Sequence, residues 1–199
     1  MIGLGLSAAI QLFVLAALLL SFERLVYVYA SRLPADFARH CAKLRIGRDP
    51  VSALERLFYF FKLIQFAVFA VWIFALSDGS PHITPDPAAL VIGAGLVLFG
   101  QFLNLSAFWR LGRVGIFYGS QFGHAVVWCE KFPFSTFRHP QYLGTVLSIW
   151  GLLLFFRFPA MDWFLLPVLQ TVYYILGSHF EGAEPGSPDE AETAAEAVR

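Results

Sequence analysis

The chain has 199 residues, of which 58% are hydrophobic, 17% are aromatic and only 14% are charged. About a quarter of a soluble domain is charged, so this composition excludes an ordinary soluble protein and predicts a polytopic membrane protein. Lysines and arginines balance the acids at a formal net charge of zero, and nucleic acid is therefore not an expected partner.

The first half of the chain alternates apolar runs with charged segments. Residues 1–22 carry no charge and are long enough for a helix that crosses a hydrocarbon layer of ~30 Å. Residues 23–56 are rich in arginine and lysine, so the positive-inside rule predicts a cytosolic loop. Residues 57–76 form a second expected span, in which Lys62 lies near the cytosolic end and snorkels out to the surface.

The middle of the chain crosses the membrane again. Residues 77–87 contain prolines and no lysine or arginine, which predicts a turn on the outer side. Residues 88–109 are apolar and predict a third span that returns inward. The basic residues within 110–140 then predict a second cytosolic segment, and the two cysteines, Cys41 and Cys129, both fall on this side, where free thiols are the default.

Two further apolar runs close the membrane part. Residues 141–156 and 164–180 predict a tight hairpin of helices, each slightly shorter than a typical span. The fold class expected is therefore an all-α integral membrane protein with about four to five transmembrane helices. Residues 1–181 are predicted to form a single domain, and residues 182–199 a mobile tail that lacks apolar periodicity.

A cationic turn precedes the helix that begins the hairpin. Proline suits the first position of a helix, so Pro140 begins it and His139 is the N-cap. The free backbone N–H groups there carry a partial positive charge and, with Arg138 beside them, predict an anion site. Tyr142 can present a hydroxyl two residues on, and Gly144 shares the face of Pro140 and removes a side chain, so that a ligand could approach.

Glycines recur upstream of this turn. Those in the segment 111–123 are spaced by three and four residues: Gly112, Gly115, Gly119 and Gly123. They would line one face if the segment is helical and form a pliable loop if it is not. Either alternative suits a surface that wraps a ligand, and the aromatic residues between them predict a gate for a lipid. These aromatics are Phe117, Tyr118 and Phe122.

Four elements in order resemble the phosphatidylethanolamine N-methyltransferase family. They are Leu-Gly-x-x-Gly-x-x-x-Gly-x-x-Phe-Gly at 111–123, Phe-Pro-Phe at 132–134, Pro-x-Tyr-x-Gly at 140–144, and Glu181 at the end of the last helix. Isoprenylcysteine carboxyl methyltransferases and membrane sterol reductases look similar around residues 138–144. The glycine segment and Phe-Pro-Phe favour the first family.

The resemblance implies S-adenosylmethionine as methyl donor, held at the cytosolic ends of the last three membrane helices, and a phospholipid amine as acceptor. Where the family has Gly-x-Gly, this chain has Leu98 and Gly100, and only Glu181 remains of a Glu-Glu pair. The cofactor-binding residues expected are Gly100, Gly112, Gly115, Arg138, His139, Pro140, Tyr142, Gly144 and Glu181.

Methyl transfer to an amine is a direct displacement that needs alignment, so no metal site is expected. The acceptor amine must first lose a proton, which makes a base useful. His124 and Glu181 are the catalytic candidates, with His179 as a rival to His124, although each histidine also suits a simple interfacial position.

Two other functions compete with this one. An NADPH-dependent reductase would bind a phosphate at the same helix start but would need more basic residues near Arg138, and a membrane scaffold would explain the glycines by packing alone. The methyltransferase would lie in the endoplasmic reticulum membrane of a eukaryote or the inner membrane of a bacterium, with its active site on the cytosolic face.

Overall fold

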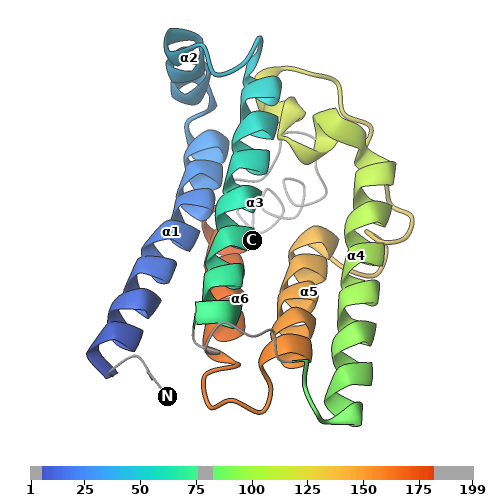
Figure 1. Cartoon of the computed structure of the whole chain (residues 1–199). Helices are drawn as coiled ribbons and strands as arrows, with labels where there is room; N and C mark the ends of the chain where they lie inside the picture. Colours follow the sequence, from blue (N-terminus) through green and yellow to red (C-terminus); the bar gives the residue numbers. More distant parts are fainter. Residues whose placement is uncertain (1–5, 76–82, 182–199) are drawn as a thin grey trace, which may run out of the picture.

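The computed structural model describes residues 6–75 and 83–181, and every regular element in this part of the chain is a helix (Figure 1). In chain order these are α1 (Leu6–Arg32), α2 (Pro34–Leu44), α3 (Pro50–Ala75), α4 (Pro87–Ile116), the short 3-10 helix η1 (Gly119–Phe122), α5 (Pro140–Arg157) and α6 (Leu165–Phe180). The predicted all-α class is confirmed.

Proline marks the start of most of these helices. It occupies the first position of α2, α3, α4 and α5, where its missing N–H has no helical partner to lose. At the start of α4, the Asp86 side chain accepts a hydrogen bond at 2.9 Å from the backbone N–H two residues later. His139 is the N-cap of α5 and Pro140 its first residue, as the sequence predicted.

Among the described residues, three helical segments are long and apolar enough to cross a membrane: Ala8–Arg32, Pro50–Phe74 and Pro87–Phe122. The expected count of four to five is not confirmed. At 18 and 16 residues, α5 and α6 extend only about 27 and 24 Å. They do form the predicted hairpin, because a short connection at residues 158–164 folds them against one another.

The predicted cytosolic loop at residues 23–56 is wrong in its outline. Helix α1 continues to Arg32 and ends where Pro34 disfavours a helical conformation for the residue before it. The rest of the stretch is α2, a short connection, and the first turns of α3, which begins at Pro50. The charged stretch therefore includes the last turns of a membrane helix.

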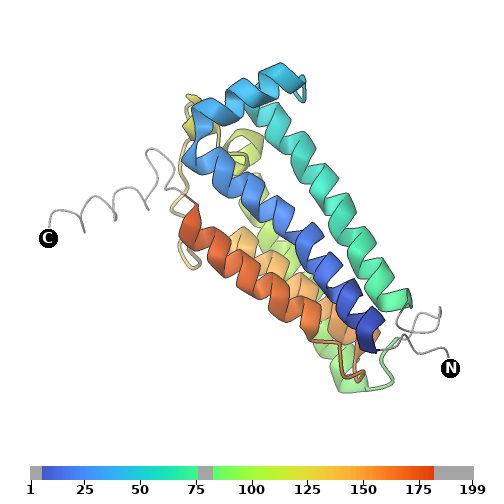
Figure 2. The ribbon, with the colours of Figure 1, turned by 90° about the vertical axis from the view of Figure 1, so that its left-hand side faces the viewer.

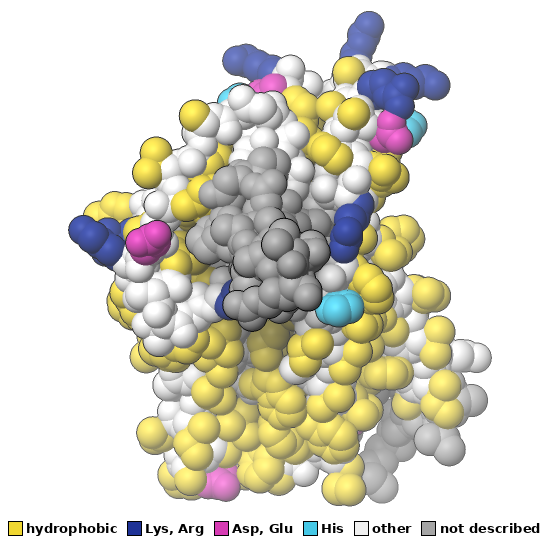
Figure 3. Space-filling model, turned by 180° about the vertical axis from the view of Figure 1, so that it is seen from behind, with side chains coloured by type: hydrophobic (Ala, Val, Ile, Leu, Met, Phe, Trp, Pro, Cys, Tyr) yellow, Lys and Arg dark blue, Asp and Glu magenta, His cyan; other side chains and the backbone are white. Residues whose placement is uncertain are grey.

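The helices form a bundle whose two ends differ. In Figures 1 and 2, α2 lies across the end where α1 finishes and α3 begins, and α1 packs between α3 and α6. Helices α5 and α6 stop lower than α3 and α4 at this end. Figure 3 shows Lys and Arg side chains gathered toward the same end on the face in view, with hydrophobic side chains over the other half.

Helices α4 and α5 pack through two pairs of glycines. A Cβ built on Gly144 would lie 2.5 Å from the carbonyl oxygen of Gly100, and one on Gly151 would lie 2.5 Å from that of Gly93. Such close approach is typical of small residues in membrane helices. The expectation that Gly100 and Gly144 leave room for a ligand is therefore corrected, because each faces the backbone of the neighbouring helix.

Two apolar clusters stabilise the bundle, one in its membrane part and one beneath α2. The first joins α1, α3, α5 and α6 and includes Trp72, Leu153 and Tyr174. The second includes Tyr27 and Tyr118 and packs α2 and η1 on the ends of α1 and α3. Tyrosines from both clusters meet at one group of charged side chains, so that group lies at the junction between them.

Candidate functional site

Glu181 is the C-cap of α6, and its buried carboxylate joins two helices. Its Oε2 atom accepts hydrogen bonds from Tyr118 Oη at 2.5 Å and from Tyr142 Oη. The sequence singled out Tyr142 and Glu181 from motifs 39 residues apart, and the structure brings them together. The shortness of α5 and α6 places this contact below the end of the bundle that carries α2 (Figure 1).

Arg24, on α1, reaches this carboxylate from the first half of the chain. Its guanidinium lies over three rings, with distances to the centroids of 4.9 Å for Tyr27, 5.2 Å for Tyr142 and 4.3 Å for Tyr174. Each ring face attracts the cation by about 0.5 to 2 kcal/mol, the higher value applying when both are desolvated. Arg24 is consequently fixed in a cage of aromatic side chains.

Glu23 and Lys62 extend the cluster into the bundle. Arg24 Nη2 is 2.9 Å from Glu23 Oε1, and Lys62 Nζ is 3.0 Å from the same oxygen. Lys62 also donates to Gln65 Oε1 at 3.0 Å and to Tyr174 Oη at 3.4 Å. The prediction that Lys62 snorkels to the surface is wrong, because its ammonium group points inward to these partners.

The cluster is neutral in sum, but among the described residues two of its charged groups each keep one atom without a hydrogen bond. Two carboxylates offset two cations, which is how buried charges are tolerated in low dielectric. Arg24 Nη1 and Glu181 Oε1 are buried 3.8 Å apart, and neither makes a hydrogen bond within the described part of the chain. A ligand that carries both an anionic and a cationic group would satisfy both atoms.

The other residues predicted around α5 take different positions. His139 stacks on Tyr142 with ring centroids 5.6 Å apart, and so lies next to the cluster. Arg138 is exposed at the start of the helix. His124 and His179 are also exposed, and the contacts that the structure gives for Glu181 include neither. Their role as a base stays a prediction.

The glycine segment is neither one helical face nor one loop. Gly112 has a φ of 63° inside α4, and Gly123 a φ of 81° after η1, a region that favours glycine. Gly115 and Gly119 are buried, and a side chain at either would meet α4 or its neighbours. The segment therefore consists of the end of α4, a turn and η1 beneath α2. It does not form the expected glycine face.

The predicted aromatic gate is corrected as well. Phe117 and Tyr118 are buried, and Phe122 stacks on Phe37 of α2 with ring centroids 5.8 Å apart. Phe117 packs on Phe58 of α3 and Tyr118 on Tyr27 of α1, so these rings fasten the end of α4 and η1 to the neighbouring helices. Of the three, only Tyr118 contributes to the cluster, through its hydroxyl.

Sequence reasoning missed the contribution of α1 and α3, namely Glu23, Arg24 and Lys62. A signal was present, because no proline or glycine interrupts the chain between residues 6 and 33, so the helix could be extended past its first charges. Ionisable residues inside a membrane helix are functional candidates by default.

Within residues 6–75 and 83–181, no group of three or more His, Cys, Asp or Glu side chains is placed to hold a metal ion.

The helices and their lipid-facing hydrophobic surface define an integral membrane protein. Residues 88–183 match the model of the phospholipid methyltransferase family. This part holds α4, η1, α5, α6 and Glu181, and its match supports membership of that family.

Three curated relatives are similar to the chain. The phosphatidyl-N-methylethanolamine N-methyltransferases of Arabidopsis thaliana and Saccharomyces cerevisiae are 32% and 33% identical over 51% and 47% of this chain, and the matches cover 56% and 44% of those relatives. Phosphatidylethanolamine N-methyltransferase B of Dictyostelium discoideum is 27% identical over 82% of each chain. The chain thus spans about half the length of the first two. No solved structure matches it significantly.

Proposed function

We propose that this protein transfers methyl groups from S-adenosylmethionine to the amine headgroup of phosphatidylethanolamine and its methylated intermediates, toward phosphatidylcholine. The observation that carries the proposal is the buried cluster around Glu181, at the end of the last helix of the family region. The names of the three relatives support the acceptor, since two describe methylation of phosphatidyl-N-methylethanolamine and one of phosphatidylethanolamine.

The two charged atoms that lack a hydrogen bond fit the donor. The methionine part of S-adenosylmethionine carries a carboxylate and an ammonium group, which suit Arg24 Nη1 and Glu181 Oε1 respectively. Tyr118 and Tyr142 keep Glu181 in place by donating to its other oxygen. Of the sequence-predicted residues we retain Tyr142, His139 and Glu181 as direct contacts.

When bound, the donor supplies an electrophilic methyl group on a sulfonium. The chain itself contributes alignment and a setting low in water, because the cluster lies between two apolar clusters. The tyrosine faces that now hold Arg24 also attract other cations, such as the acceptor amine as it gains methyl groups. Glu181 can accept a hydrogen bond from that amine.

The arrangement also suggests an orientation. We propose that the end bearing α2, where the basic loops gather, faces the cytosol of the endoplasmic reticulum membrane or bacterial inner membrane. Residues 1–181 would then act as one domain, since Arg24 of α1 and Glu181 of α6 share one site.

The test uses purified protein in phospholipid vesicles with methyl-labelled S-adenosylmethionine. We expect label in mono-, di- and trimethylated phosphatidylethanolamine. Glu181→Gln should bind S-adenosylhomocysteine about tenfold to a hundredfold more weakly, the range for losing a charge-assisted hydrogen bond of about 1.5 to 3 kcal/mol. The exposed Glu130→Gln is the matched control and should bind as the parent does.

Two results would overturn the proposal. One is label in the base-labile methyl ester of a prenylated cysteine peptide with none in phospholipid amine. The other is a thermal shift with NADPH and none with S-adenosylhomocysteine, which would identify the reductase alternative.

A further inference from the structure

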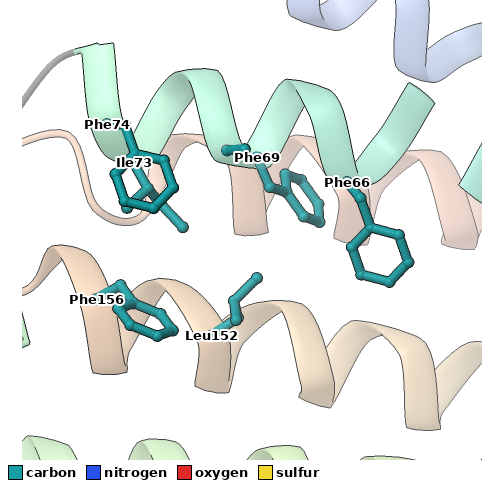
Figure 4. Close-up of a pocket in the computed structure, with 7 residues that line it drawn as sticks. Phe66, Phe69, Ile73, Phe74, Leu152 and Phe156 are labelled. Atoms are coloured by element: carbon teal, nitrogen blue, oxygen red, sulfur yellow. The ribbon is translucent and has the colours of Figure 1, made fainter. Parts of the chain in front are cut away.

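An apolar cavity of about 180 Å³ lies between α3 and α5 in the membrane part of the bundle. Its lining residues are Phe66, Phe69, Ala70, Ile73, Phe74, Leu152 and Phe156. Figure 4 shows the side chains of the two helices facing one another across it. Phe66 and Phe74 are more than 40% exposed, so the cavity opens on the surface that faces lipid.

The α3 wall of this groove leads to the charged cluster. Lys62, Phe66, Phe69 and Ile73 follow one another at spacings of four, three and four residues, which places them on one face of the helix. The apolar wall therefore ends at Lys62, whose ammonium group lies 3.0 Å from Glu23.

The α5 wall is likewise a stripe of side chains on one helix face that ends at the charged cluster. Tyr142, Ile149, Leu152 and Phe156 share one face of α5, and Tyr142 ends this stripe at Glu181. The two walls are connected at the top through Tyr174, which is 3.4 Å from Lys62 Nζ and whose ring lies 5.3 Å from that of Tyr142. The lined cavity and the cluster thus lie on the same faces of α3 and α5, with the cluster at the end of both stripes.

The length of the groove fits one fatty acyl chain. The lining residues on α3 run from Phe66 to Phe74, about 12 Å at 1.5 Å per residue, and Lys62 lies one turn before them, which makes about 18 Å from the cluster to the far end. One leaflet of a ~30 Å hydrocarbon layer is about 15 Å thick. A lipid whose headgroup lies at the cluster would therefore extend one tail along the whole groove.

We propose that the α3–α5 groove binds one acyl chain of the phospholipid acceptor, so that the lipid enters sideways between these helices with its headgroup at Lys62, next to the donor site at Arg24. This rests on the proposed function for the identity of the headgroup. It replaces the gate expected at residues 116–123, whose rings are turned inward. The cations at the top of the groove complement the phosphate of the headgroup, and the apolar walls complement its tail.

The first test fills the groove. Ala70→Phe places a ring among the lining residues, whereas Ala67→Phe, one turn away on the exposed face of α3, is the matched control. We expect Ala70→Phe to reduce methyl transfer to long-chain phosphatidylethanolamine roughly tenfold or more, since an overpacked site loses its ligand. Binding of S-adenosylhomocysteine, and transfer to a short-chain phosphatidylethanolamine, should be retained. Equal loss with both chain lengths would contradict the proposal.

The second test does not depend on activity. The protein is placed in vesicles containing phosphatidylethanolamine with a photoreactive diazirine either near the carboxyl end or near the methyl end of one acyl chain. We expect the first probe to label α3 near Phe66 and the second to label residues near Phe74 and Phe156, with Ala70→Phe but not Ala67→Phe losing both. Label spread evenly over exposed positions such as Leu63, or in the reverse order, would overturn the groove.

If no methyl transfer is found but the ordered labelling is, the proposed function fails and the lipid groove stands. If transfer is found without ordered labelling, the function stands and the groove fails.

Discussion

Replacing Arg24 by glutamine tests the energetics of the buried cluster most directly. The substitution removes a cation that contacts three tyrosine rings and the carboxylates of Glu23 and Glu181. Breaking a buried ion pair by removing one partner costs about 3 to 5 kcal/mol, because the remaining charge stays buried without compensation. We expect Arg24→Gln to lower the free energy of unfolding by about that amount.

Glu181→Gln should be milder. The amide oxygen still accepts from the tyrosines, and Arg24 keeps Glu23 as its partner, so the loss is about 1 to 3 kcal/mol. The double variant removes both charges, Arg24 and Glu181, so neither stays buried without the other. The two losses should therefore fall short of additivity by about 1 to 3 kcal/mol.

The assay is reversible unfolding by SDS in mixed micelles, with the four proteins of this cycle compared under one condition. Arg39→Gln is the control, because Arg39 pairs with Asp36 on the exposed surface of α2 and its loss should leave unfolding unchanged. Strict additivity, or an effect of Arg24→Gln no larger than that of Arg39→Gln, would refute the view that the cluster is a coupled buried network.

Three further predictions follow from the packing and the orientation. Gly144→Ala should lower stability by about 1 to 3 kcal/mol in the same assay. Gly95→Ala, with nothing within 4 Å of its Cβ, should raise stability by up to about 1 kcal/mol. Equal effects of the two variants would contradict the tight α4–α5 contact. Burial raises the pKa of the Cys41 thiol, so alkylation by iodoacetamide should be slow at pH 7 and accelerate as the pH rises toward that pKa; a rate that is fast and independent of pH would contradict it. A protein without its native cysteines is placed in sealed inside-out vesicles and treated with an impermeant maleimide. Arg48→Cys should react and Asp78→Cys should not, and equal labelling would contradict the orientation.

Local motifs carried the sequence prediction of the site. Pro140 fixes the start of α5 through backbone chemistry that depends on neighbouring residues alone, so His139 and Tyr142 could be placed correctly. The spacing of the last apolar run likewise placed Glu181 at the end of α6. The hairpin and the all-helical class followed from apolar runs in the same way.

Long-range pairings could not be predicted from such signals. Lys62 and Tyr174 are 112 residues apart, and only the packing of α1 between α3 and α6 brings Glu23 to them. Arg24 was missed because the first charged residue predicts the end of a membrane helix. The free-energy cost of burying a charge depends on its partners, and the sequence does not show which residues these are. The glycines at 100 and 144 were misread since close packing and ligand access require the same small residue.

The position of Arg24 bears on how this protein can be divided. The segment that matches the family model begins at residue 88, so any cut there separates Glu181 at the end of α6 from Arg24 on α1. The C-terminal helices are consequently not an autonomous module. Chimaeras between relatives should exchange the arginine and its aromatic cage together with the glutamate, because the two charges are paired within the folded protein.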